Sequence, residues 1–206
     1  MKTNGLIHYR LLFGLAGLLL FIGGIVRIAQ AQVQGGYSPP YYETDVPPCR
    51  WSGASSSGTT KELQYVIDGS VPSGWHFGVA VIKSDWNNTS VPFNFTNIAS
   101  GLPGWKMKLQ AGYYGQNTNS NTWYSCAGGN VHDNPVISIN RSLSAVESNY
   151  NYRRGHIGHE FGHSMVFGHI STAGQPLTTL MGYNPDPYQY VTPQSGDQQT
   201  IRSAYP

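Results

Sequence analysis

Two histidines and a glutamate lie together in the sequence His159-Glu160-Phe161-Gly162-His163. On an α-helix, residues four positions apart share one face, so the two imidazoles can bind a single metal ion. Neutral imidazole is a good ligand for zinc, and Glu160 lies beside the ligands, where it can take a proton from a metal-activated water. His159 and His163 are therefore candidate zinc ligands, and Glu160 is the candidate general base.

Two further histidines compete for the place of a third ligand. His156 shares the helical face of His159 and His163 but lies seven residues before His163, about 10.5 Å along a helix. His169 follows His163 by six residues and would face away if the helix continued, so the chain must turn before it. Gly168 can make this turn, because glycine tolerates the left-handed backbone that ends helices. We favour His169 as the third ligand and expect His156 to lie outside the ligand set.

The pattern as a whole resembles the metzincin zinc peptidases, in which H-E-x-x-H-x-x-G-x-x-H precedes a methionine turn. The match comprises the three favoured histidines, Glu160 and the later sequence Thr179-Leu180-Met181-Gly182-Tyr183. One position departs from the family pattern, because the family's glycine is Val166 in this chain. Residues 63–72 are similar to the first strand of matrixin-like catalytic domains, and the resemblance spans residues 50–205.

The resemblance implies a secreted zinc endopeptidase that acts on a protein or peptide substrate. It places Met181 beneath the metal and makes Tyr183 a second catalytic residue, which donates a hydrogen bond to the tetrahedral oxyanion. A substrate peptide would lie extended along an edge strand, for which residues 122–127 are a candidate. Structural Ca²⁺ is possible by family resemblance, but the sequence contains no ligand cluster that supports it.

The implied fold is α+β and zincin-like: a twisted mixed β-sheet, a backing helix, an active-site helix and a small irregular C-terminal subdomain ending in a helix. The residue patterns are typical of these elements. Helices are expected at residues 72–86, at residues 143–167 and after Thr192-Pro193, with Thr192 as N-cap. Strands are expected at residues 63–67, 91–98, 105–114, 122–127 and 135–140.

The N-terminus has the pattern of a secretory signal peptide. Residues 11–26 are sixteen apolar or glycine residues, and Ala29-Gln30-Ala31 is an A-x-A cleavage pattern. A membrane span needs about 20 residues, so we expect cleavage after Ala31 and no stable membrane association afterwards. The predicted organisation is a signal peptide at 1–31, an extended leader at 32–48 and one metallopeptidase catalytic domain at 49–206. The predicted location is extracellular.

Composition limits the partners. Charged residues make up 11% of the chain, against about 25% in average domains. Loss of Lys2, Arg10 and Arg27 with the signal peptide would leave nine basic and ten acidic residues. No basic stripe remains, so nucleic acid is not an expected partner. We expect a monomer with a loop-rich, weakly charged surface.

The chain has two cysteines, Cys49 and Cys126. In an exported protein a disulfide between them is the default expectation. The sequence Pro47-Pro48-Cys49-Arg50 leaves a second possibility, in which the Cys49 thiolate caps the zinc as in the matrixin propeptide switch.

Two other functions stay open from the sequence. The chain could be a secreted zinc-binding module that kept the fold without activity, although the intact Glu160 argues against it. It could also be a zinc amidase acting on non-protein amides, against which the methionine-turn sequence argues.

Overall fold

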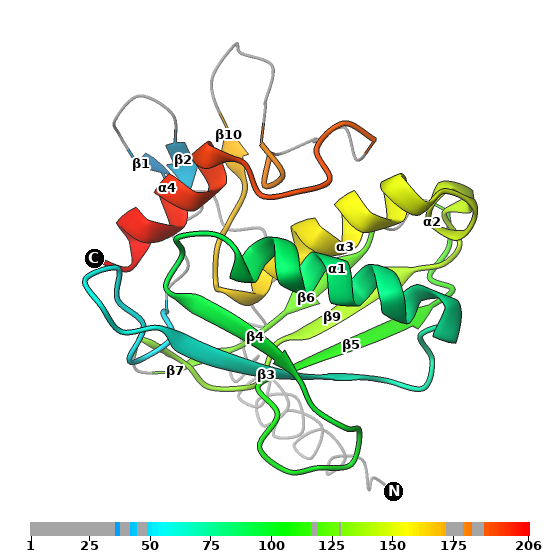
Figure 1. Cartoon of the computed structure of the whole chain (residues 1–206), viewed down its shortest axis with the longest axis horizontal. Helices are drawn as coiled ribbons and strands as arrows, with labels where there is room; N and C mark the ends of the chain where they lie inside the picture. Colours follow the sequence, from blue (N-terminus) through cyan, green and yellow to red (C-terminus); the bar gives the residue numbers. More distant parts are fainter. Residues whose placement is uncertain are drawn as a thin grey trace, which may run out of the picture.

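A five-stranded mixed β-sheet carries two long helices on one face, and a third helix lies at the C-terminal end of the chain (Figure 1). The computed structural model describes residues 36–37, 42–44, 49–116, 119–127, 129–171, 179–182 and 188–206. The expected α+β class is confirmed, with a mixed sheet, a backing helix, a helix that carries the two histidines and an irregular C-terminal part ending in a helix.

The sheet has the strand order β4-β3-β5-β9-β6, in which the first four strands are parallel and β6 is antiparallel to β9. β6 is therefore an edge strand. The strands of this sheet are β3 (Lys61–Ile67), β4 (Phe93–Asn97), β5 (Met107–Gly112), β6 (Asn121–Trp123) and β9 (Val136–Asn140). Two small sheets contain β1 (Gly36–Tyr37), β2 (Tyr42–Thr44) and β10 (Ile170–Ser171), and β7 (Cys126–Ala127) with β8 (Asn130–Val131).

The helices are η1 (Ser73–Trp75), α1 (His76–Asn87), α2 (Ser144–Ser148), α3 (Tyr150–Ser164) and α4 (Ser195–Ala204). α1 buries Val79, Ile82 and Trp86, the face expected from their spacing. The Trp86 indole N–H donates to the Gly158 carbonyl of α3 over 3.0 Å, and Nε and Nη2 of Arg154 on α3 form a bidentate ion pair with Asp85. These contacts hold α3 against the backing helix.

The core continues from the sheet into α3. The Phe161 ring packs against Tyr65 of β3 and Phe95 of β4, with ring centroids 5.5 and 5.2 Å apart. Phe161 lies next to Glu160 in the sequence, so burying Phe161 in the core also fixes the rotation of the helix that carries the candidate site.

Three expected boundaries were wrong. The helix expected at 143–167 is two helices, because Asn149 is extended (φ −116°, ψ 120°) and caps α3 by accepting from the Tyr152 N–H. The strand expected at 122–127 is split into β6 and β7, since residues 126–127 pair with β8 instead of the main sheet. The last helix begins at Ser195 with Gln194 as N-cap, not Thr192, because Gln194 and Asp197 complete a reciprocal capping box.

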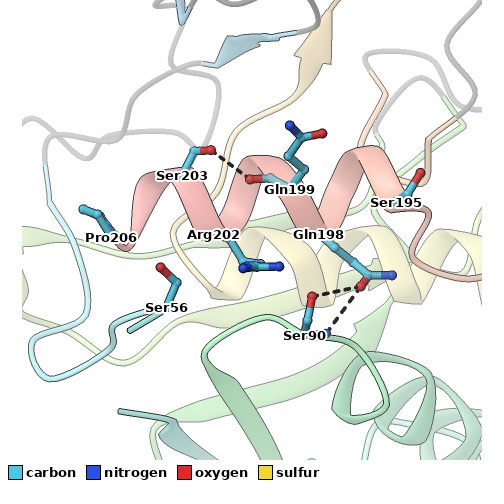
Figure 2. A pocket seen from close by; sticks show the side chains of 8 residues that line it. All are labelled: Ser56, Ser90, Ser195, Gln198, Gln199, Arg202, Ser203 and Pro206. Atoms are coloured by element: carbon cyan, nitrogen blue, oxygen red, sulfur yellow. Dashed lines mark hydrogen bonds between the residues drawn. The ribbon is translucent and has the colours of Figure 1, made fainter. Parts of the chain in front are cut away.

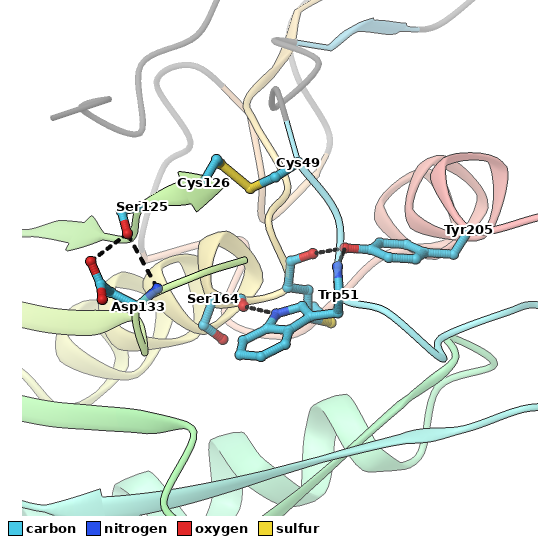
Figure 3. The surroundings of a disulfide bond; sticks show 8 residues. Cys49, Trp51, Ser125, Cys126, Asp133, Ser164 and Tyr205 are labelled. Carbon is cyan, nitrogen blue, oxygen red and sulfur yellow. Dashed lines mark hydrogen bonds between the residues drawn. A yellow bond between two sulfur atoms is a disulfide. The ribbon is translucent and has the colours of Figure 1, made fainter. Parts of the chain in front are cut away.

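Cys49 and Cys126 form a disulfide, as the sequence led us to expect, so the Cys49 sulfur is bonded to another sulfur (Figure 3). The bond joins the start of the described domain to β7. The predicted signal peptide lies outside the described residues, as does most of the predicted leader apart from β1 and β2. Of the helices that the structure describes, none has the length and apolar character to cross a membrane.

Candidate functional site

Three imidazole nitrogens converge at one point beside α3. The Nε2 atom of His159 lies 3.0 Å from Nε2 of His163 and 3.1 Å from Nε2 of His169. Each residue can offer one ligand atom so that all three lie within 4.8 Å of one another. His159 and His163 come from successive turns of α3, and His169 comes from the segment that follows the helix.

Two of the rings are held in the form that binds metal. Nδ1–H of His159 donates to the Leu180 carbonyl over 2.7 Å, and Nδ1–H of His163 donates to the Phe167 carbonyl over 2.6 Å. Such bonds leave the Nε2 lone pairs directed at the common point. Tetrahedral zinc with Zn–N bonds of about 2.0–2.1 Å requires nitrogens ~3.3 Å apart. The residues present therefore fit a zinc ion.

Burial keeps these imidazoles neutral. It lowers the pKa of His159, lowers the pKa of His163 well below its usual value with help from the neighbouring histidines, and lowers the pKa of His169 to about 3. Neutral imidazole is the form that ligates zinc. Among the described residues these three histidines are the group that could hold a metal ion.

The turn that brings His169 back is made at Val166, not at Gly168 as expected. α3 ends at Ser164, and Val166 has φ 58°, the left-handed region, while Gly168 is not among the residues with positive φ. A non-glycine residue loses about 1–2 kcal/mol in that region. Val166 is 1% exposed, so burial of its side chain offsets the strain. The left-handed turn therefore lies at Val166, the position at which this chain departs from the H-E-x-x-H-x-x-G-x-x-H pattern.

The end of α3 is closed by two aromatic side chains from distant parts of the chain (Figure 3). The Trp51 indole N–H donates to the Ser164 carbonyl over 2.9 Å, and the Tyr205 hydroxyl donates to the Met165 carbonyl over 2.6 Å. Carbonyls at a helix C-terminus lack helical donors. These bonds supply the donors where the chain turns toward His169.

Met181 lies against α3 at Gly162, the residue before His163. It is fully buried, and a Cβ atom at Gly162 would overlap its sulfur, so only glycine at position 162 permits this approach. Leu180 N–H and Met181 N–H donate to the buried Asp197 carboxylate over 3.0 and 2.9 Å. Asp197 thereby fixes the segment whose Leu180 carbonyl orients His159.

Glu160 is the acidic residue of the site, and it is 4% exposed. Its carboxylate oxygen Oε2 lies 2.8 Å from the hydroxyl of Thr122 on β6. Burial raises the pKa of Glu160 to about 7, and the Thr122 hydroxyl acts in the opposite direction. A carboxyl group with a pKa near neutrality can both accept and release a proton.

The structure places one of the two remaining candidate residues, His156, and does not describe the other, Tyr183. His156 does not belong to the converging group; it is half-buried and stacks on Tyr152 with ring centroids 5.8 Å apart. Tyr183 lies outside the described residues, so its predicted role stays a prediction.

The sequence did not predict the contacts that four residues make around the site: Thr122, Asp197, Trp51 and Tyr205. Their partners lie 38, 16, 113 and 40 residues away in the sequence. The capping-box spacing of Gln194 and Asp197 was a local signal, but it does not reveal that the same carboxylate binds Leu180 and Met181.

Two other features show no comparable chemistry. A groove of about 630 Å³ runs along α4, and its lining shares no residue with the histidine cluster (Figure 2). It is lined by Ser56, Ser90, Ser195, Gln198, Gln199, Arg202, Ser203 and Pro206.

On the β7–β8 side, the Ser125 hydroxyl donates to Asp133, which also contacts His132. There the serine engages the carboxylate instead of the imidazole, so this is not a hydrolase triad.

No protein-family model matches the chain, and no curated protein sequence matches it. Solved structures similar to it include high choriolytic enzyme 1, a hatching enzyme zinc-protease from Oryzias latipes (medaka fish). That likeness has a TM-score of 0.46 and 16% identity, covering 76% of this chain and 94% of that one. Myroilysin is similar with a TM-score of 0.44 and 11% identity, covering 84% of this chain and 99% of that one. Likeness at this level does not establish a family, so function must be argued from the chain's own histidines and Glu160.

Proposed function

We propose that this chain is a secreted zinc-dependent endopeptidase, similar to metzincins of the matrixin-like kind. The observation that carries the proposal is the convergence of three Nε2 atoms beside a buried glutamate that follows the first histidine. His159, His163 and His169 would hold the metal. Three protein ligands leave zinc a fourth position, which is typical of catalytic and not of structural sites.

A zinc ion held by His159, His163 and His169 would lower the pKa of a bound water molecule and polarise the substrate carbonyl. Glu160 takes a proton from the attacking water and delivers it to the nitrogen of the leaving amine. Tyr183 donates a hydrogen bond to the tetrahedral oxyanion. Met181 is fully buried against Gly162 of α3, and in this proposal it forms the apolar floor beneath the metal.

The proposed substrate is a protein or peptide bound in an extended form along β6. This strand ends the five-stranded sheet, so its outer edge has no strand partner within the described part of the chain. An extended peptide can add to such an edge through main-chain hydrogen bonds. The residue at the middle of β6, Thr122, contacts Glu160, so a peptide on this edge would lie close to the base.

Secretion is part of the proposal. The Cys49–Cys126 disulfide supports it, because such bonds persist in oxidising compartments outside the cytosol. We propose that residues 1–31 are the signal peptide, that residues 32–48 are a leader and that the catalytic domain at 49–206 acts as a monomer.

The test is hydrolysis of casein by the purified, zinc-loaded protein, with Glu160→Ala as the variant and the exposed Glu62→Ala as its control. We expect Glu160→Ala to keep its zinc and to lose activity by about 10²-fold or more, because general-base catalysis contributes ~10²–10⁴-fold. Glu62→Ala should match wild type, and a chelator should abolish activity until zinc is restored.

Other outcomes separate the alternatives. Full activity in Glu160→Ala would reject the proposed base. A folded, zinc-loaded wild type that cleaves no peptide bond would indicate a binding module. Hydrolysis of cell-wall amides without hydrolysis of casein would indicate an amidase.

A further inference from the structure

A buried threonine lies between the edge strand and the carboxylate of Glu160. Thr122 is the middle residue of β6 and is 2% exposed. Its hydroxyl lies 2.8 Å from Glu160 Oε2 and 3.0 Å from the Glu160 main-chain carbonyl oxygen. The two residues are 38 positions apart in the sequence, so the contact exists only through the packing of α3 on β6.

The Thr122 hydroxyl has one proton, so it can donate fully to only one of these two acceptors. The Glu160 carbonyl lies inside α3, four residues before the last helical residue, where a helical N–H is its ordinary donor. The carboxylate is the closer acceptor, and hydrogen bonds to an ionised group are the stronger ones. The hydroxyl therefore donates to Oε2, which leaves Oε1 as the carboxylate oxygen that can take a proton.

The backbone of β6 around Thr122 is held in place by β9. Thr122 pairs with Ile137 of β9, and Asn140 N–H donates to the hydroxyl of Ser120, just before β6, over 2.8 Å. Threonine is itself stiff about χ1 because it is branched at Cβ. A hydroxyl held this way can define the position of a longer and more mobile glutamate side chain.

We propose that Thr122 is a positioning residue for the general base: its hydroxyl holds the Glu160 carboxylate in place for proton transfer. The proposal rests on the proposed peptidase function. It also means that β6 serves two purposes. The side chain of Thr122 holds the base, and the main chain of the same strand would bind the substrate.

The first experiment compares Thr122→Val, which keeps the shape and removes the hydroxyl, with Thr122→Ser, which keeps the hydroxyl. Thr200→Val is the matched control, because Thr200 is also buried but donates only to a main-chain carbonyl of α4 over 2.9 Å. Zinc content, kcat and KM on a peptide substrate are measured for each variant.

We expect Thr122→Val to bind a full complement of zinc and to lose about 10- to 100-fold in kcat, because a misplaced catalytic group can lose ~10²-fold. KM should stay within about twofold of wild type, since the main chain of β6 is unchanged. Thr122→Ser should recover kcat to within about threefold, and Thr200→Val should match wild type. A wild-type kcat in Thr122→Val, or an equal loss in Thr122→Ser, would overturn the proposal.

The second experiment does not depend on activity. The Tm of zinc-loaded protein is measured for Thr122→Val, for Glu160→Leu and for the double variant. With Glu160 present, removal of the hydroxyl leaves a buried carboxylate without its donor and should lower Tm by about 4 °C or more. In the Glu160→Leu background, the same change should lower Tm by about 1 °C or less, because the main-chain carbonyl at that position keeps its helical donor.

Together the two experiments distinguish failure of the proposed peptidase function from failure of the role proposed for Thr122. If wild type hydrolyses no peptide, the proposed function fails, and the Tm cycle alone decides whether the hydroxyl holds the carboxylate. Equal Tm losses in the two backgrounds would show that Thr122 bonds to the main chain and not to the carboxylate, which would overturn the inference whatever the activity.

Discussion

His159 and His163 owe their orientation to two main-chain carbonyls, those of Leu180 and Phe167. Each bond commits Nδ1 as the donor and leaves Nε2 as the proposed ligand atom. His156, one turn earlier on α3, stacks on Tyr152 and is not in the converging group. The proposed ligands are thus the histidines whose Nε2 atoms converge, whereas His156 packs against another side chain of α3.

Zinc stoichiometry distinguishes these histidines. We expect His169→Ala to lose most of its bound zinc, because two imidazoles remain where three converge. His156→Ala should keep about one zinc per chain, with its structure otherwise unchanged. Metal analysis of the purified variants after dialysis measures both. The reverse pattern, with zinc kept in His169→Ala and lost in His156→Ala, would reject the ligand assignment.

At the scale of elements, the site depends on how closely α3 approaches the segment at residues 179–182. Gly162 and Gly158 lie one turn apart on α3, and both face this segment. A Cβ atom at Gly158 would meet Leu180 at 3.4 Å, an ordinary contact, whereas one at Gly162 would overlap Met181. α4 holds the segment from its other side through the Asp197 carboxylate.

The pair of glycines gives a matched test of this packing. We expect Gly162→Ala to destabilise the protein by about 1–3 kcal/mol, since a buried methyl without space strains its neighbours. Gly158→Ala should be neutral or stabilising by up to ~1 kcal/mol, because alanine favours helix over glycine. Denaturant unfolding of both variants measures the difference. Equal stability of the two would mean that Met181 does not lie against α3.

At the scale of the whole molecule, residues from both ends of the described domain close around the end of α3. Trp51, near the start of the domain, and Tyr205, near the end of the chain, bind consecutive carbonyls there. The Cys49–Cys126 disulfide anchors the segment before Trp51 to β7. The turn that carries His169 is therefore supported by the global fold and not by its own sequence.

Removal of the disulfide should weaken the fold without emptying the metal site. The bridge spans 77 residues, and a loop of that size stabilises the folded state by about 4.5 kcal/mol at most. We expect a Cys49→Ala/Cys126→Ala double variant to unfold at lower denaturant concentration and still to bind about one zinc per chain. Loss of zinc from a variant that remains folded would show that the metal site depends on the disulfide, contrary to this expectation.

The sequence by itself determined whatever depends on neighbours along one element. The i, i+4 spacing put His159 and His163 on one helical face with Glu160 beside them, and the spacing of Val79, Ile82 and Trp86 gave the buried face of α1. These relations follow from the helix repeat, which is a property of the local backbone.

Tertiary structure alone decided what joins distant segments. Val166 takes a left-handed conformation that its own preference opposes. Thr122 reaches Glu160 from another strand, and Asp197 reaches Leu180 and Met181 from the last helix. Local preferences amount to about 1 kcal/mol per residue, so burial and hydrogen bonds made across the fold can override them.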